Sequence, residues 1–176
     1  MSGHSHWAGI KHKKEIKDAK RGILFSKLLN MISVAAKPEP NPEFNPHLRD
    51  AILKAKENSV PQDNIDRAIK KAAEKNSDLE ELTLEAYGPG GIAMLMVAIT
   101  DNRNRTIPQI KKVLADGGGK WAEPGSVLWA FEERKPGKEP VAKFTQPVSE
   151  EEKKKLALLI EELENHEDIQ AIYTNT

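Results

Sequence analysis

The chain has 176 residues, of which 38% are hydrophobic and 31% charged, and it contains no cysteine. This composition indicates a soluble globular protein of one or two domains, and it excludes disulfides, thiolate metal sites and a cysteine nucleophile. The longest apolar run, residues 92–99, is too short to cross a bilayer, so no membrane partner is expected. The N-terminus lacks the apolar stretch of a secretory signal, and we expect a cytoplasmic protein.

The charges are separated along the chain, although 27 basic and 27 acidic residues give a net charge of zero. Residues 1–37 carry eight bases and two acids, residues 38–75 carry seven of each, and residues 76–176 carry 12 bases and 18 acids. The N-terminal cluster is typical of proteins that bind a polyanion such as nucleic acid. A solvated, disordered tail would have a similar composition.

Three amphipathic helices are predicted after this basic arm. The first ends before the prolines of residues 38–42, which cannot continue a helix. Asn45 and Pro46 form an N-cap and N1 pair for the second helix, and Pro61 opens the third. Because short isolated helices are marginal in water, we expect the three to pack together as a domain covering residues 1–77.

The pattern changes to strands in the second half of the chain. Residues 82–87 and 92–99 are strand-like, and the glycine-rich residues 88–91 between them predict a turn. The second run is apolar at nearly every position, so both of its faces should be covered.

A helix with a capping box at Thr106 and Gln109 is predicted next, and it stops at the glycines of residues 117–119. Residues 127–131, which include Trp129 as a core residue, and residues 141–144 read as two more strands.

A second capping box, Ser149 with Glu152, opens the last helix, and residues 169–173 form the last strand. Apart from the first hairpin strand, the order is β-α-β-β-α-β, the ferredoxin-like pattern. The predicted fold class is therefore α+β: a three-helix domain followed by a ferredoxin-like domain over residues 78–176, with an extra N-terminal hairpin strand.

The basic arm supplies most of the candidate nucleic-acid contacts. Its lysines and arginine suit phosphate groups, and partly charged imidazoles fit the same surroundings. Its tryptophan could stack on a base or pack back onto the helices. These candidates are His4, His6, Trp7, Lys11, His12, Lys13, Lys14, Lys17, Lys20, Arg21 and Lys27.

A second candidate contact is the segment Asp101–Thr106, where Arg103 and Arg105 lie in a loop that enters a helix. Arginine binds phosphate in a bidentate manner, and a helix N-terminus adds amide donors. The alternative is that Asp101 pairs with an arginine while the polar residues cap the helix.

The sequence predicts no catalytic or metal site. The arm's histidines have no further ligand beside them, and no nucleophile, base and orienting group form a recognisable set. We therefore expect neither an enzyme nor a cofactor, metal or small-molecule substrate.

Several ordered blocks of the sequence resemble the YebC/PmpR family. They are Gly3–Lys14, Asp18–Gly22, Pro61–Ile69, Tyr87–Gly91, Thr100–Thr106, Gly125–Val127 and Asp168–Tyr173. The resemblance implies an N-terminal helical domain, following α/β domains, and a cytoplasmic regulator without catalytic residues. Family members are named as probable DNA-binding transcriptional regulators. Others, including mitochondrial translational activators, act at the ribosome where proline-rich nascent chains stall.

The chain departs from the family in one respect. Members are usually longer, with a further α/β domain inserted after the strand that corresponds to residues 127–131. Here residues 132–140 form a short charged linker. The inserted domain would carry part of the usual surface, so its absence bears on the choice of partner.

Three functional hypotheses follow. The protein is a ribosome-associated translation factor that contacts ribosomal RNA, a transcriptional regulator that binds duplex DNA, or a ferredoxin-like module that senses a small molecule. The sequence favours RNA, because the bases lie on a flexible, glycine-containing arm rather than on a recognition helix. No dimer-forming heptad is visible, so a monomer is expected.

Overall fold

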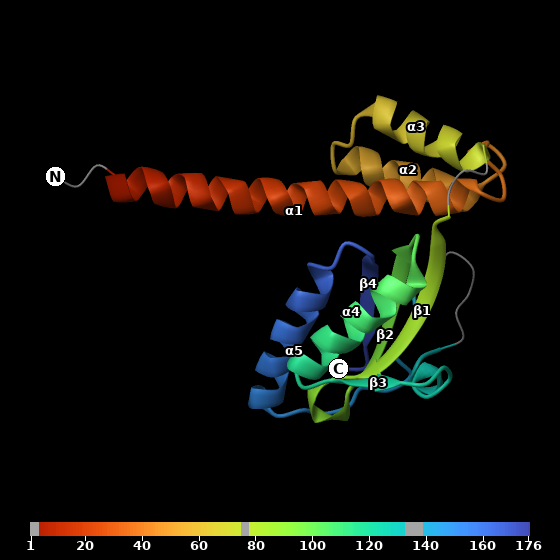
Figure 1. Ribbon diagram of the computed structural model, residues 1–176. Coiled ribbons are helices and arrows are strands. Elements are labelled where there is room, and N and C mark those ends of the chain that lie inside the picture. Colours follow the sequence, from red (N-terminus) through yellow and green to blue (C-terminus); the bar gives the residue numbers. More distant parts are fainter. Residues whose placement is uncertain (1–3, 75–77, 133–138) are drawn as a thin grey trace.

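The computed structural model describes residues 4–74, 78–132 and 139–176, except for the side chains of residues 4–14 and 16. Three helices lie across one end of a four-stranded antiparallel sheet, and two more helices cover one face of the sheet (Figure 1). The elements are α1 (His4–Ala36), α2 (Pro46–Glu57), α3 (Gln62–Ala73), β1 (Glu80–Tyr87), η1 (Pro89–Gly91), β2 (Ala93–Thr100), α4 (Arg103–Asp116), β3 (Lys120–Ala122), η2 (Leu128–Ala130), α5 (Glu150–Glu164) and β4 (Ile169–Thr174).

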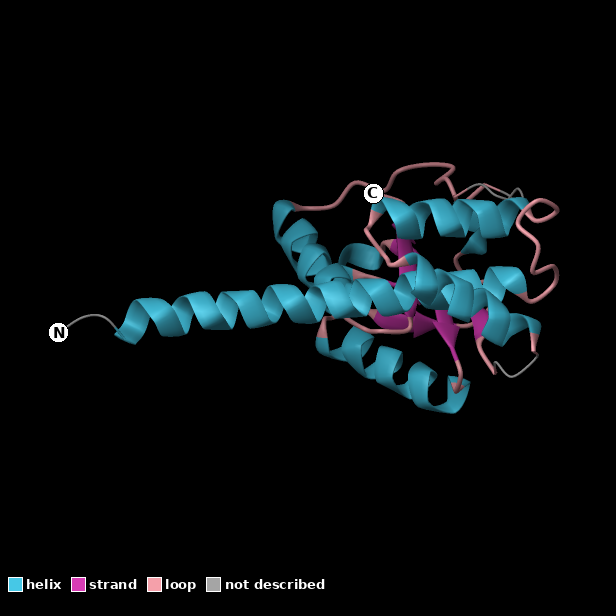
Figure 2. Cartoon of the chain, turned by 90° about the horizontal axis from the view of Figure 1, so that it is seen from above, coloured by secondary structure: helices cyan, strands magenta, loops and turns pink. Residues whose placement is uncertain are grey.

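The basic arm is the first half of a single 33-residue helix, α1. The prediction of a flexible arm is therefore wrong. Gly9 and Gly22 each cost about 1 kcal/mol relative to alanine, but most other residues of the segment favour a helix and no proline interrupts it. The N-terminal half extends beyond the rest of the molecule (Figure 2).

The second half of α1 packs on α2 and α3, as the apolar stripes predict. Leu28 and Ile32 of α1, Leu48 of α2 and Ile65 of α3 are buried in one cluster. Asn45 caps α2 through a hydrogen bond from the Leu48 amide at 3.0 Å, which confirms the predicted cap.

The sheet has the strand order β3-β1-β2-β4, and all of its pairs are antiparallel. Helices α4 and α5 cover one face, where Leu84 of β1 and Met96 of β2 meet Leu114 and Leu159 of the helices. All eight residues of β2 are buried, as predicted for a strand covered on both faces. The sequence predicts β1 as an addition outside the β-α-β-β-α-β order. This strand pairs with both β2 and β3 and therefore lies inside the sheet.

The α+β class and the β-α-β-β-α-β-like order of the second half are confirmed, but two predicted strands are wrong. Residues 127–131 contain the short helix η2, and residues 141–144 contribute only an isolated bridge between Phe131 and Ala142. The strand that follows α4 is β3, which lies at the edge of the sheet next to β1. Trp129, predicted as core, is 56% exposed.

The reason is a buried carboxylate. Glu85 of β1 is 4% exposed and accepts hydrogen bonds from the backbone amides of Gly125, Val127 and Leu128 at 2.5, 2.7 and 3.2 Å. Gly125 supports this turn with a φ of 88°, a conformation that glycine adopts without strain. Because the chain curls around the carboxylate, it cannot extend into a strand.

Candidate nucleic-acid interface

The candidate interface begins on the projecting half of α1. Lys17, Lys20 and Arg21 are exposed there, and the first residue to join the helical core is Phe25. The Arg21 guanidinium lies 5.1 Å from the centre of the Phe25 ring, which orients it without neutralising it. Lys20 lies 3.9 Å from the Glu161 carboxylate of α5, a loose exposed pair that contributes little stability.

Lys27 occupies a different position from the other bases of α1. It is half-buried against the end of α5, where its ammonium group donates a hydrogen bond to the Glu164 carbonyl oxygen at 2.5 Å. Burial lowers the pKa of Lys27, and the nearby Glu164 charge opposes this shift. Lys27 therefore joins the two halves of the molecule.

Because the arm is helical, most of its basic positions fall on one side of the helix. At 100° per residue, positions 6, 13, 14, 17, 20 and 21 fall within an arc of about 120°. The two acids, Glu15 and Asp18, fall outside this arc, as do positions 4, 11 and 12. The side chains of His4, His6, Trp7, Lys11, His12, Lys13 and Lys14 lie outside the described residues.

The other candidates, Arg103 and Arg105, lie in the first turn of α4 rather than in a loop, and the predicted capping box at Thr106 is wrong. Asn102 is the N-cap, and its side chain accepts a hydrogen bond from the Arg105 amide at 3.2 Å. Thr106 is buried inside the first turn, and its hydroxyl lies 2.8 Å from that of Thr100 at the end of β2.

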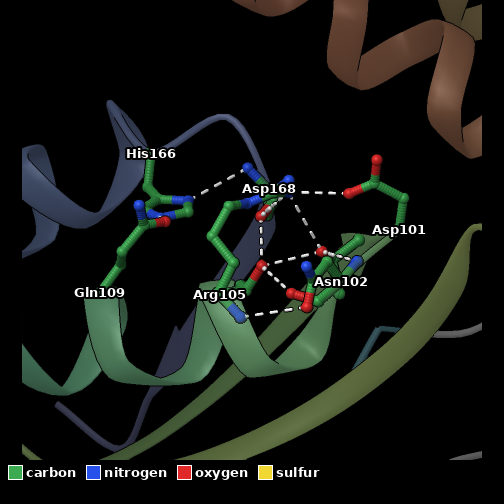
Figure 3. A network of polar contacts seen from close by, with 8 residues as sticks. Asp101, Asn102, Arg105, Gln109, His166 and Asp168 are labelled. Atoms are coloured by element: carbon green, nitrogen blue, oxygen red, sulfur yellow. Dashed lines mark hydrogen bonds and ion pairs between the residues drawn. The ribbon is translucent and has the colours of Figure 1, made fainter.

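A polar network joins the start of α4 to the start of β4 (Figure 3). The buried Asp168 carboxylate accepts hydrogen bonds from the Thr106 hydroxyl at 2.5 Å and from the Arg105 guanidinium at 3.3 Å. Arg105 also pairs with Asp101 at 2.9 Å. Hydrogen bonds with Asp168 and Asp101 raise the pKa of Arg105, so this side chain stays charged.

His166 extends the network toward α4. Its Nδ1 accepts a hydrogen bond from the Asp168 amide at 3.2 Å, which leaves the proton on Nε2 to donate to the Gln109 side-chain oxygen at 3.1 Å. Burial lowers the pKa of His166, although the nearby Asp168 charge opposes the shift. Burial and these two hydrogen bonds together favour the neutral ring with its proton on Nε2.

A cleft of about 950 Å³ lies above this network, between α1 and α3 on one side and the α4 side of the sheet on the other. It brings Asn30 of α1 and Lys71 of α3 opposite Arg105 and His166. Four carboxylates also line it, so its charge is mixed. They belong to Asp78, Asp101, Glu167 and Asp168.

The structure thus places the predicted bases in two separate groups. The arm residues up to Arg21 lie on the extension of α1, whereas Lys27 lies against α5, and Arg103 and Arg105 lie on the body, each within reach of acids. Arg103 pairs with Glu80 at 3.1 Å, but its side chain remains 56% exposed. Sequence reasoning missed Glu85 and Asp168. The sequence signal for Glu85 was an acid between the apolar residues Leu84 and Ala86 of a strand, both of which are buried.

Replacing Arg105 by Ala is expected to lower Tm by a few degrees, because the buried Asp168 loses its cationic partner. Arg103→Ala is the matched control and is expected to leave Tm unchanged, because its pair with Glu80 is exposed. Thermal unfolding followed by circular dichroism measures both. An unchanged Tm for Arg105→Ala would contradict the structural role. Equal losses of nucleic-acid binding in both variants, at constant Tm, would favour contact with phosphate.

Two family models match the chain. The N-terminal domain of TACO1/YebC proteins matches residues 5–75, and the second and third domain of these proteins matches residues 79–135. The chain belongs to the TACO1/YebC family, which confirms the resemblance found in the sequence.

Curated relatives share about half of their aligned residues with this chain. A probable transcriptional regulatory protein of Aquifex aeolicus is 48% identical over 99% of the chain and 70% of the relative. A protein of the same description from Solibacter usitatus is 47% identical over 83% of the chain and 60% of the relative. One from Halothermothrix orenii is 51% identical, and 54% of its length is covered. The chain thus spans little more than half of several relatives.

The fold also matches a solved structure. The crystal structure of a conserved hypothetical protein from Aquifex aeolicus superimposes with a TM-score of 0.82 and 33% sequence identity. The alignment covers 97% of this chain and 96% of that one. No helix among the described residues combines the length and apolar character that crossing a membrane requires.

Proposed function

We propose that this protein is a cytoplasmic, non-enzymatic regulator of gene expression that binds nucleic acid through the basic half of α1. The observation that carries the proposal is the projecting helix, whose register gathers five lysine and arginine positions and His6 in one arc while the acids fall outside it. The names of the curated relatives, probable transcriptional regulatory proteins, support a role in gene expression.

The leading target is ribosomal RNA, with the protein acting as a translation factor that assists elongation through stalling sequences. The flexibility of the arm no longer supports this choice, because the arm is a helix. Charge separation does support it. The first 18 residues of α1 span about 27 Å, so the tip of the helix lies several Debye lengths from the helical core at physiological salt, whereas Lys20 stays next to Glu161 of α5. A deep RNA-lined site would admit this helix and leave the acidic body outside.

Duplex DNA is the alternative, and two observations favour it. The relatives are named as transcriptional regulators, and a single α-helix fits the major groove. Against it, the groove is only about 8.5 Å deep, so a helix lying in it would bring Glu161 and its neighbours on α5 close to phosphate.

Co-sedimentation with ribosomes separates the two targets. We expect the protein to pellet with ribosomes at moderate salt, and excess random duplex DNA should fail to release it. Both interactions weaken with salt, so salt sensitivity alone does not distinguish them. Release by an equimolar amount of duplex would contradict the ribosome proposal and favour the DNA reading.

We further propose that the chain divides at residue 77 into the helical unit and the sheet unit, as the sequence predicts. The separate apolar clusters of the two halves support this division.

A further inference from the structure

Four large apolar side chains on the segment that leaves the sheet after β3 are exposed. Leu128 and Trp129 of η2 are 47% and 56% exposed, and Val141 and Phe144 are 56% and 45% exposed. The rings of Trp129 and Phe144 stack with their centres 5.4 Å apart. These four residues, called the apolar patch below, make up half of the large hydrophobic side chains that are exposed among the described residues.

The backbone beneath the apolar patch is firmly held. Glu85 fixes the turn that precedes η2, and the Trp129 indole donates a hydrogen bond to the Ser126 carbonyl oxygen at 2.6 Å. The Lys143 amide donates to the Ala130 carbonyl oxygen at 2.9 Å, which ties the second part of the patch to the first. A partner would meet a preformed surface and pay little ordering entropy.

The apolar patch lies at the boundary of the region that matches the family. The match to the second and third family domains ends at residue 135, between the two parts of the patch. The curated relatives are longer than the aligned region. Residues 139–149 lead to α5, and the four side chains on the two sides of this boundary are exposed.

We propose that the apolar patch is the contact surface between two copies of this chain, related by a two-fold axis, in place of the monomer expected from the absence of a heptad pattern. An aromatic side chain buries about 150–250 Å² when fully covered, and the smaller Leu128 and Val141 bury less, so the four half-exposed side chains offer at most about 400 Å². A standard interface needs about 800 Å² per partner, of which the apolar centre is about half. The exposed polar residues around the patch can supply the remainder.

Charge complementarity favours a second copy over a nucleic acid at this surface. Exposed charges of both signs, Glu132, Glu139 and Lys143, lie at the edge of the apolar patch. A two-fold axis can place Lys143 of one copy opposite an acid of the other. The chain has no net charge, so two copies do not repel each other, whereas the three described charges at this edge, two acids and one lysine, do not favour a polyanion.

Sedimentation velocity of the full chain over a wide concentration range tests this proposal. We expect a reversible shift from the 19.6 kDa monomer to twice that mass, with a dissociation constant in the micromolar range. Leu128→Glu is expected to raise the dissociation constant at least about tenfold, because it places a charge in the apolar contact. Val141→Lys is a second variant in case the first one unfolds.

Leu158→Glu is the matched control, because Leu158 is an exposed apolar side chain on α5, 65% exposed, that does not belong to the apolar patch. It should leave the dimer intact. The dimer should also persist at about 0.5 M salt, whereas association of a basic arm with an acidic body would be screened. A monomer at every concentration, or a dimer that both patch variants leave unchanged, overturns the proposal. A third outcome also overturns the proposal: the parent chain is monomeric, and the patch variants lose ribosome binding. The apolar patch would then be a contact with the ribosome.

Discussion

Replacing Lys13 and Lys14 together by Glu is expected to weaken binding to ribosomes at least about tenfold at about 0.1 M salt. Two positive positions in the basic arc of α1 become repulsive toward phosphate. The slope of log affinity against log salt should fall by about two, since two phosphate contacts are lost. Pelleting across a salt series measures both quantities.

The control is another double Lys→Glu replacement, made on α5 instead of on the arm. Lys153 and Lys154 are adjacent, exposed lysines near the start of α5, and their replacement by Glu alters the net charge equally. Lys153 pairs with Glu150 at 2.8 Å, but both side chains are exposed and such a pair contributes little stability, so the fold should remain intact. If both double variants lose binding equally, net charge and not the arm governs the interaction. If neither does, the arm is not the contact.

Glu85→Ala is expected to lower the free energy of unfolding by about 3 kcal/mol, because three backbone amides lose a charged acceptor in a buried place. For a chain of this size the Tm should fall by roughly 6–12 °C. Glu85→Gln should recover only part of the loss, since an amide offers one acceptor oxygen in place of two. Calorimetry measures these changes.

Glu123→Ala is the control for this experiment, because Glu123 is an exposed acid in the same segment. Its Tm should stay within about 1 °C of the parent, as for most surface substitutions. A Glu85→Ala variant that melts like the Glu123→Ala variant would show that the segment from Gly125 to Phe131 holds its conformation without the carboxylate. In that case the preformed apolar patch would also need another explanation.

These two experiments address different parts of the molecule. The lysine reversal tests the proposed function on the extension of α1. The Glu85 replacement tests the anchor beneath the apolar patch, which lies on the opposite half of the chain. A dimer that dissociates in Glu85→Ala while ribosome binding persists would agree with independent roles for the two surfaces.

Features that depend on neighbouring residues could be predicted from the sequence. Asn45 before Pro46 and Ser149 before Glu152 specify helix starts because their side chains accept hydrogen bonds from amides a few residues away. The apolar run of residues 92–99 predicts a strand covered on both faces for a similarly local reason, since each side chain must avoid water. The separation of charge is also a property of the sequence itself.

The tertiary structure decided the rest. Residues 127–131 have the composition of a strand, but their conformation follows from Glu85, a residue some 40 positions earlier that no local pattern links to them. Arg105 likewise belongs to a buried network because Asp168 arrives from the far end of the chain. The direction of the basic arm depends on where α1 meets its bundle. Hydrogen bonds and burial between distant segments exist only once the chain has folded, so local sequence patterns cannot specify them.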